Sequence, residues 1–432
     1  MAFASECCKY TFPQSNGLPF NSNVMPSAID AAPQHIDSGV KCVASTGAVF
    51  HCPVPTTRKD GVPISNLFRH AKFTADGTSL ITHNEDNRLR TYVLPTDLLD
   101  EQEQPHALTE HSSFRSASNI QSYALYPGFD LQDTSTTLAL CGSAFVPISL
   151  KNVLQYDIIH ATYPLINEKT EAHLPPRSLL FTRNGSHFIA GSENALAAFD
   201  CSRDGSGPLF LHQLKPGRKA PQNSLQAQRR GAVSALAISA DGVLALGTTL
   251  REVALYEQEG LGQCASVFSL ESGVGTGVTS VDWSPCGKYL LVAERQSDVF
   301  QVYDIRDTHQ KVTTLIGRNA NTTQTLNIDV IPTATGYELW GGGLDGKVRM
   351  WRNPGSIEND VGPDAAFKIA DAPVSSTAWH PSGAVLATSS GRRLAHSLAS
   401  DGSDSEDEDD ANISALPSSL PDNTLRVWTL RD

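Results

Sequence analysis

Residues 345–351 read Asp-Gly-Lys-Val-Arg-Met-Trp, and two other stretches repeat this pattern without a gap. They are Asp-Asn-Arg-Leu-Arg-Thr-Tyr at 86–92 and Asp-Asn-Thr-Leu-Arg-Val-Trp at 422–428. Each begins with Asp and a turn-forming residue, and continues as an alternating stretch that ends in an aromatic residue. Asp-Asn and Asp-Gly are typical of tight hairpin turns, and the alternation is that of a half-buried strand. The three copies predict a β-hairpin unit that recurs along the chain.

A second unit precedes the first at a regular distance. Residues 278–287 have the pattern of a strand followed by a Pro/Gly turn, and equivalent turn glycines recur every 45 to 57 residues. This spacing is close to the period of about 40–45 residues of a WD-repeat blade. Seven such units begin near residues 67, 121, 176, 232, 277, 325 and 373. The sequence therefore predicts an all-β protein, a seven-bladed WD-repeat β-propeller.

The propeller is expected over residues 45–432, after a short flexible N-terminal extension over residues 1–44 that is rich in Ser, Pro, Asn and Gly. The last blade lacks an outer strand, so a strand from the N-terminal region, around residues 47–54, is expected to close the ring. The turn acids are expected to form hydrogen bonds across a blade, and the aromatic residues to pack between blades. The residues given these structural roles are Asp86, Tyr92, Asp345, Trp351, Asp422 and Trp428.

The chain carries 46 acidic and 33 basic residues, a formal net charge of −13, which argues weakly against a general nucleic-acid coat. Its charge is nevertheless uneven. Residues 205–240 contain no Asp or Glu, and the basic residues in this stretch are Lys215, Arg218, Lys219, Arg229 and Arg230. Such a cluster can bind RNA phosphates in a protein that is acidic overall, so these five are candidate RNA contacts. A solvated loop without a ligand is the alternative.

A second biased segment, residues 391–421, interrupts the last blade and contains seven acids between Asp401 and Asp410. A run of like charges predicts a disordered insert. Ser403 and Ser405 are each followed three residues later by Glu, the context that acid-directed kinases favour, and are candidate phosphosites. The hypotheses for this insert are a regulated tether and a shield against non-specific RNA.

No motif of a known catalytic type is present: HExxH, GxSxG, a P-loop and a metal-spaced Cys/His cluster are all missing from the sequence. We therefore expect a protein that is not an enzyme, with no cofactor, no bound metal and no small-molecule substrate. The eight Cys form no CxxC pair, which favours reduced thiols. Without a signal peptide or a long apolar run, the chain is expected to be a soluble intracellular monomer without membrane contacts.

Specific segments resemble one WD-repeat family, the telomerase Cajal body proteins, which include fungal relatives tied to small nuclear RNAs. Residues 66–95 are similar to that family's opening blade, and the likeness extends over about residues 60–432. Further similar segments are residues 123–127, 146–150, 178–181, 190–191, 302–306, 317–319, 322–324, 380–381 and 386–393. The chain departs from the family at Leu125 and at Lys151-Asn152, where the family favours Trp and Trp-Asp, so blade two is expected to pack more loosely. Its N-terminal extension is also short.

The resemblance implies a non-catalytic scaffold that binds a single-stranded box in small nuclear or Cajal body RNA of the H/ACA type, with telomerase RNA among the candidates. It implies ribonucleoprotein or telomerase proteins as partners, and a role in ribonucleoprotein assembly or nuclear-body localisation. The implied location is the nucleus, in the nucleoplasm or in Cajal-type bodies, and a cytoplasmic pool is also compatible with the sequence.

The same resemblance implies Arg306 and Arg318 as RNA contacts, and an inter-blade salt bridge is the alternative for Arg306. The competing function is a protein–protein adaptor without direct RNA contact, associated with pre-mRNA splicing or acting as a ubiquitin-ligase substrate receptor.

Overall fold

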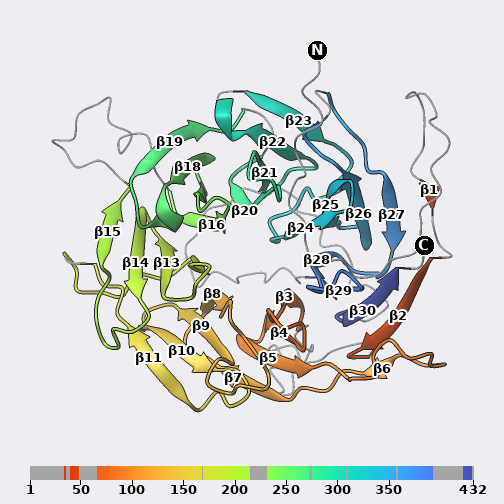
Figure 1. Ribbon diagram of the computed structural model, residues 1–432, viewed down its shortest axis with the longest axis horizontal. Helices are drawn as coiled ribbons and strands as arrows, with labels where there is room; N and C mark the ends of the chain where they lie inside the picture. The colour runs from red at the N-terminus through yellow and green to blue at the C-terminus, as the bar shows by residue number, and fades with distance from the viewer. Residues whose placement is uncertain are drawn as a thin grey trace, which may run out of the picture.

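Seven antiparallel sheets surround a common axis in the computed structural model, which confirms the predicted seven-bladed propeller (Figure 1). The structure describes residues 34–35, 39–47, 66–167, 169–214, 231–271, 275–307, 310–356, 359–392 and 422–430. In each blade the first strand lies next to the axis and the last lies at the rim. Alternating residues in these strands bury one side against the next blade, so each unit needs its neighbours to form a core.

The strands of each of the first four blades are ordered from the axis outwards as they occur in the chain. Blade 1 has β3 (Phe68–Phe73), β4 (Ser79–Asn84), β5 (Arg88–Val93) and β7 (Ser112–Arg115). Blade 2 has β8 (Ile120–Leu125), β9 (Leu138–Ser143), β10 (Ile148–Asn152) and β11 (Ile159–Tyr163). Blade 3 has β12 (Ser178–Phe181), β13 (His187–Ser192), β14 (Ala195–Asp200) and β15 (Phe210–Gln213). Blade 4 has β16 (Val233–Ile238), β17 (Leu244–Thr248), β18 (Glu252–Tyr256) and β19 (Cys264–Ser269).

Blade 5 is also formed by four consecutive strands, whereas blades 6 and 7 include strands from elsewhere in the chain. Blade 5 has β20 (Val278–Trp283), β21 (Tyr289–Glu294), β22 (Phe300–Asp304) and β23 (Lys311–Leu315). Blade 6 has β24 (Ile328–Thr333), β25 (Gly336–Gly342), β26 (Lys347–Arg352) and β27 (Ala365–Lys368), with β1 (Gln34–His35) parallel to β27. Blade 7 has β28 (Val374–Trp379), β29 (Val385–Ser390), β30 (Leu425–Leu430) and β2 (Val40–Ser45), with β6 (His106–Ala107) parallel to β2. Two short 3-10 turns are η1 (Gln258–Gly260) and η2 (Ile305–Asp307).

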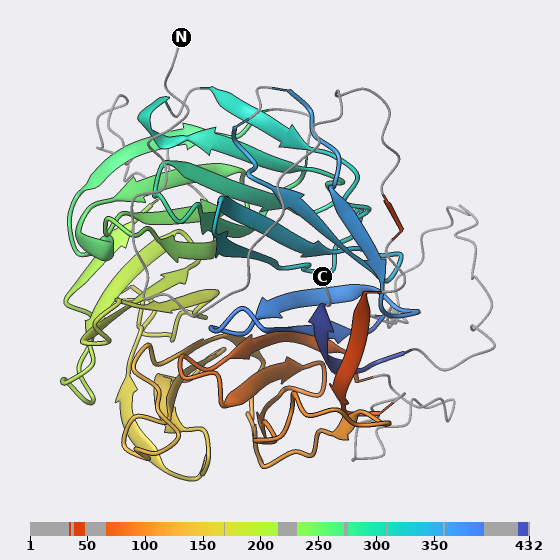
Figure 2. The ribbon, with the colours of Figure 1, turned by 45° about the vertical axis from the view of Figure 1, so that its right-hand side comes forward.

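The ring is closed by β2, which pairs antiparallel with β30 so that Val40 lies opposite Leu430 and Ser45 opposite Arg426 (Figures 1 and 2). The sequence prediction of a closing strand around residues 47–54 was wrong in position. In this strand Val43 and Ala44 are both buried in the core of blades 1 and 7, where the pairing with β30 shifts register between Cys42 and Ala44. Residues 40–44, assigned to the flexible extension from the sequence, are therefore part of the propeller.

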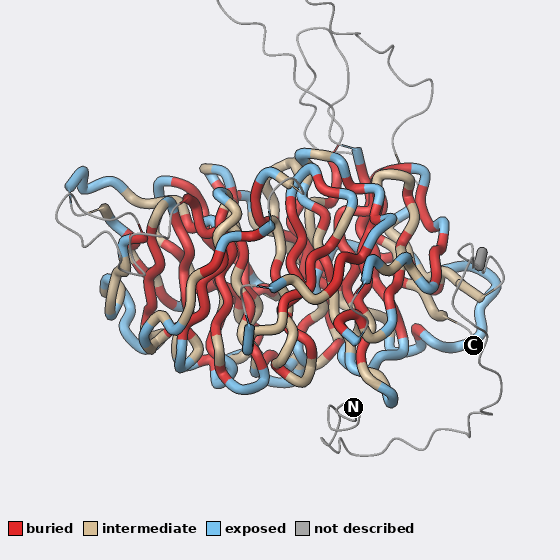
Figure 3. The backbone as a smooth tube through the Cα atoms, turned by 90° about the horizontal axis from the view of Figure 1, so that it is seen from above, coloured by how far each residue is buried: buried red, intermediate tan, exposed pale blue. Residues whose placement is uncertain are grey.

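The repeated aromatic residues lie at the boundaries between blades. Tyr92 is buried against Leu425 and Val427 of blade 7, and Trp351 contacts Phe300 of blade 5 with ring centroids 5.2 Å apart. Trp428 packs in the cluster that contains Trp340 of blade 6. Each of these rings faces the preceding blade, so the core consists of layers between sheets, with exposed residues at the two ends of the strands (Figure 3).

Lys151 and Asn152, the positions at which the sequence departs from the family, are both buried in β10. The Lys151 ammonium lies 4.2 Å from the centre of the Phe114 ring and donates a hydrogen bond to the Tyr156 carbonyl at 3.2 Å. The cation–π contact and the hydrogen bond compensate the buried charge. A buried Lys with a cation–π contact and a hydrogen bond therefore occupies the place of the aromatic residue that the family favours. The structure shows no looser packing around Lys151 and Asn152.

The up-and-down order of the strands divides the connections between two faces. Face A, as we call it, is where each innermost strand begins, and it carries the links between second and third strands and between successive blades. Face B, at the opposite end, carries the links between first and second and between third and fourth strands. Any loop residue can thus be assigned to a face from its place in the blade.

Two carboxylates on innermost strands give the fold a pH dependence. Burial raises the pKa of Asp329 to about 7 and that of Asp282 to about 6, although Lys72 on β3 opposes both shifts. The folded state therefore retains a proton that the unfolded chain has lost, so stability falls as pH rises from about 4 to about 7. We expect Asp329→Asn, which can still accept the hydrogen bond from the Trp379 N–H, to remove most of this loss.

The variant should be more stable than the wild type by on the order of 2 kcal/mol at pH 8 and equal to it near pH 4. Urea denaturation at the two pH values measures this difference. Asp282→Asn is the matched variant, and its gain should be smaller and complete by about pH 6. A gain for Asp329→Asn that is the same at both pH values would contradict the assignment.

Candidate nucleic-acid interface

Each repeated turn acid is paired with an Arg four residues later on the third strand of the same blade. Asp86 binds Arg90, Asp345 binds Arg349 at 2.6 Å, and Asp422 binds Arg426 at 2.9 Å. The acids thus act within their own blade. All three copies read Asp-x-x-x-Arg, so the signal was present in the sequence, although turn residues and strand alternation do not reveal it.

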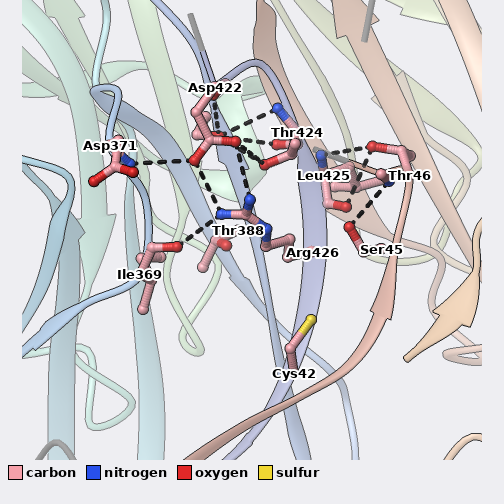
Figure 4. Close-up of polar contacts among 12 residues, drawn as sticks. Cys42, Ser45, Thr46, Ile369, Asp371, Thr388, Asp422, Thr424, Leu425 and Arg426 are labelled. Atoms are coloured by element: carbon pink, nitrogen blue, oxygen red, sulfur yellow. Dashed lines mark hydrogen bonds and ion pairs between the residues drawn. The ribbon is translucent and has the colours of Figure 1, made fainter. Parts of the chain in front are cut away.

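The pair in blade 7 also ties the closing strand to face A (Figure 4). The Arg426 guanidinium donates to the Ile369 carbonyl at 2.8 Å, and the Asp422 carboxylate accepts the Asp371 N–H at 3.2 Å. Beside them, the Thr46 N–H donates to the Leu425 carbonyl at 3.0 Å and the Thr46 hydroxyl accepts the Leu425 N–H. Blade 6, blade 7 and the end of β2 are therefore joined at one point of this face.

Most acidic side chains in the described loops of face A are neutralised by a basic neighbour. Besides the three repeated pairs, Arg69 binds Glu85 and Lys311 binds Glu271, both at 2.5 Å, and Lys368 lies 3.5 Å from Asp371. The loops of this face also hold basic residues, which are Lys169, Arg177, Arg251, Arg295, Arg318 and Arg392. The described loops of face A are therefore close to electrically neutral.

Face B has the opposite character. Its described loops carry many acids, which are Asp76, Asp97, Asp100, Glu101, Glu103, Asp130, Asp133, Asp157, Asp204, Asp241, Glu257, Glu259, Asp307, Asp360 and Asp364. The basic residues in the same loops are Arg183, Arg203, Lys288 and Arg306. Because phosphates are repelled by an excess of carboxylates, face A is the better candidate for contact with nucleic acid.

The basic stretch found in the sequence begins and ends on face A. Its five basic residues, Lys215, Arg218, Lys219, Arg229 and Arg230, lie outside the described residues. The flanking residues are both held by Asn194, in the turn between β13 and β14: the Leu214 N–H donates to the Asn194 carbonyl at 2.8 Å, and the Gly231 N–H donates to the Asn194 side chain at 2.9 Å. Both ends of the segment are thus fixed at one turn of this face.

Arg306 lies on face B, in η2, away from the basic segment. Its side chain is 64% exposed, and its guanidinium donates to the Asp304 carboxylate, with Nη2 at 2.5 Å from Oδ2. The partner belongs to the same blade, so the alternative of an inter-blade salt bridge is wrong for this pair. An exposed Arg that is neutralised by its neighbour and surrounded by acids is poorly placed to bind phosphate.

Arg318 lies on face A, but its side chain is buried and the residue is only 1% exposed. The guanidinium lies 4.4 Å from the centre of the Phe300 ring and donates to the Leu326 carbonyl at 2.5 Å, while its Nε has no hydrogen-bond partner. Burial lowers the pKa of Arg318 to about 9. The expectation that it contacts RNA is not supported by this position, since the side chain holds the link between blades 5 and 6 together.

Comparisons with known proteins agree with this architecture. The WD40 family (WD domain, G-beta repeat) matches residues 262–299, which run from β19 into blade 5. The chain is 30% identical over 296 residues to guanine nucleotide-binding protein negative regulator 1 of Schizosaccharomyces pombe, covering 68% of this chain and 72% of that protein. It is 26% identical over 372 residues to telomerase Cajal body protein 1 of Bos taurus, covering 84% of this chain and 65% of the bovine protein.

The chain belongs to the same family of WD-repeat proteins as the fission yeast protein, and it is similar to the telomerase Cajal body proteins. With the human telomerase Cajal body protein 1 it shares 26% identity over 339 residues, 76% of this chain and 58% of the human protein. The chain thus spans slightly less than two thirds of these mammalian relatives. The part in common is the propeller, so the family relation supports a WD-repeat scaffold.

The acidic insert of this family member leaves and rejoins the propeller on face A, between Arg392 and Asp422. The candidate phosphosites Ser403 and Ser405 lie outside the described residues. The basic and acidic segments therefore start from the same face, although they are far apart in the sequence.

Two kinds of feature are missing from the described residues. No group of three or more of their His, Cys, Asp or Glu side chains is arranged to hold a metal ion. In the same part of the chain, no helix has the length and apolar character needed to cross a lipid bilayer.

Proposed function

We propose that this protein is a non-catalytic scaffold that binds small nuclear or Cajal body RNA of the H/ACA type on face A, with telomerase RNA among the candidates. The observation that carries the proposal is the difference between the faces. Acids crowd the described loops of face B, whereas most acids in the described loops of face A are paired, and both ends of the basic segment are held at Asn194 on face A. Single-stranded RNA loops are recognised by base stacking and edge contacts beside phosphate-binding cations, which this face can offer.

The bound RNA would bring the protein to ribonucleoprotein or telomerase proteins and to the nucleus, in the nucleoplasm or in Cajal-type bodies. The names of the mammalian relatives refer to telomerase and Cajal bodies, which supports this part of the proposal. The acidic insert would act as a regulated tether or as a shield against non-specific RNA, modified at Ser403 and Ser405. We expect deletion of residues 396–418 to alter phosphate labelling or partner binding.

The test is binding of the purified chain to a single-stranded loop RNA of the H/ACA type, measured by fluorescence anisotropy at several salt concentrations. If all five basic residues of the segment contact phosphates, replacing Lys215, Arg218, Lys219, Arg229 and Arg230 by Gln should reduce the slope of log K against log salt by about 3 to 4. The affinity at low salt should fall by about 100-fold or more. The matched control replaces Arg203, Lys288 and Arg306 on face B by Gln, and it should leave both quantities unchanged.

Failure of the wild type to bind RNA at low salt would reject RNA binding and leave a protein–protein adaptor, for splicing or as a ubiquitin-ligase substrate receptor. One observation favours this second candidate. Ile158, Ile159 and Leu209 are exposed on or next to face B among acidic loops, a surface suited to a basic and apolar protein segment. The name of the fission yeast relative, a negative regulator of a guanine nucleotide-binding protein, also refers to a protein partner.

A further inference from the structure

Phe145 is the most exposed large apolar side chain of the described residues, with 75% of its surface accessible. It lies on face A, in the turn between β9 and β10. Its backbone is left-handed, with φ of 65°. Bulky residues avoid this region because the Cβ atom approaches the following carbonyl. The side chain is thus both solvated and held in an unfavourable backbone conformation, a combination that neither core packing nor local stability explains.

The equivalent turns in other blades show what this position ordinarily holds. The left-handed residues there are Asn87, Asn194, Arg251, Gln296 and Gly346. Asn and Gly tolerate positive φ, and Asn87 and Asn194 also use their side chains to bind neighbouring loops. The Phe145 side chain has no such role, since it points to solvent.

The turn that carries Phe145 is firmly supported by the link between blades 1 and 2. The Ala144 N–H donates to the Asn119 carbonyl at 2.9 Å, and the Ser118 hydroxyl donates to the Ala144 carbonyl. The link that contains Ser118 is in turn held by Asn87, whose side chain donates to the Ser118 carbonyl at 2.8 Å. The aromatic ring therefore projects from a rigid base, which is what a preorganised contact requires.

The immediate surroundings suit a polyanion. The two loops beside the ring, residues 116–119 and 144–147, contain no charged residue. The basic residues flanking them are Arg115, which is exposed at the end of β7, and Arg177, which donates to the Gln121 side chain at 2.6 Å. In the described part of the chain neither guanidinium has a carboxylate within 4.0 Å, so both can bind phosphate.

We propose that Phe145 is a stacking platform for an unpaired base of the bound RNA, with Arg115 and Arg177 contacting the adjoining phosphates. The inference rests on the proposed function and adds a specific contact to it. Val146 is the one exposed apolar neighbour of the ring within its turn, so this apolar surface is small for the docking of a protein. An exposed ring near two guanidinium groups that have no carboxylate partner among the described residues fits a nucleotide better. The other exposed apolar residues of face A are Val146, which is 39% exposed in the same turn, and Ile166, Leu250 and Ile316, which lie in different loops.

The decisive variant is Phe145→Gly, because Gly accepts positive φ and removes the ring. Its melting temperature should equal or exceed that of the wild type. Its affinity for the H/ACA-type loop RNA should fall by about 5- to 100-fold with an unchanged salt slope, since stacking involves no counterion release. Phe145→Trp should retain the affinity, whereas Arg115→Gln and Arg177→Gln should each lower the slope by about 0.7. A purely structural residue would not lose binding while gaining stability.

Leu250→Ala is the matched control, an exposed apolar residue in the equivalent link of blade 4, and it should bind RNA as the wild type does. If the wild type binds RNA and Phe145→Gly binds equally well, the ring does not stack on a base. The exposed ring would then be assigned to a contact with a protein partner. That result would overturn this inference and leave the proposed function intact. Failure of the wild type to bind would instead overturn the proposed function.

Discussion

Deleting residues 1–46 is expected to open the ring and to lower the stability of the whole propeller. The deletion removes β2, whose Val43 and Ala44 fill the core between blades 7 and 1, and it leaves β30 and β6 without their shared partner. Loss of these buried side chains and strand hydrogen bonds should cost about 5 kcal/mol or more. The exposed edge of β30 should also promote association between molecules.

Differential scanning fluorimetry and light scattering measure the two effects. The matched control deletes only residues 1–33, which leaves β1 and β2 in the chain, and it should melt like the full-length protein. Ala44→Asp in the full-length chain should reproduce most of the destabilisation, because it buries a charge at a fully enclosed position. Equal melting temperatures and monodisperse solutions for both deletions would contradict the role assigned to β2.

Arg90→Ala is expected to produce the largest loss of stability among single changes in the repeated Asp–Arg pairs. The side chain of Arg90 is fully buried and that of Asp86 is 5% exposed, so the variant leaves a buried carboxylate without its main counterion. Removing one partner of a buried pair costs about 3–5 kcal/mol. Arg88, whose guanidinium lies 3.7 Å from Asp86, compensates only in part.

The control is the homologous pair in blade 6, where Asp345 and Arg349 are 27% and 11% exposed. Arg349→Ala should therefore cost less, about 1–2 kcal/mol, in the same denaturation experiment. The double variant Asp86→Asn with Arg90→Met should recover part of the stability lost by Arg90→Ala, since the buried carboxylate of Asp86 is removed and Glu110, the other partner of Arg90, is 36% exposed to solvent. Equal losses for Arg90→Ala and Arg349→Ala would show that burial of the pair does not set its contribution.

The fold could be predicted from the sequence because a propeller blade is built from local contacts. Turn residues, two-residue alternation and a regular period occur within about 50 residues, and each predicted unit corresponds to one observed sheet. The structural residues Asp86, Asp345 and Asp422 were also identified, although their partners were not. Their Arg partners lie four residues along the same strand, which a comparison of the three copies would have shown.

The face and the exposure of the candidate site residues could not be predicted from the sequence. Arg306 and Arg318 are only 12 residues apart, yet one is exposed on face B and the other is buried on face A. No sequence pattern predicts that Phe145 is exposed, since a Phe in a strand-rich sequence is expected to be in the core. Its turn is held by hydrogen bonds to Asn119 and Ser118, which lie about 25 residues earlier in the link between blades 1 and 2.

The sequence by itself determined the number of blades, the family and the separation of acidic and basic segments along the chain, because all of these depend on residues close together in sequence. Only the tertiary structure decided that β2 closes the ring, that acids collect on face B, and that the ends of the basic segment meet at Asn194 on face A. These properties arise when strands from distant parts of the chain are arranged around one axis. Charge and exposure are then set by neighbours across blades, which no local pattern specifies.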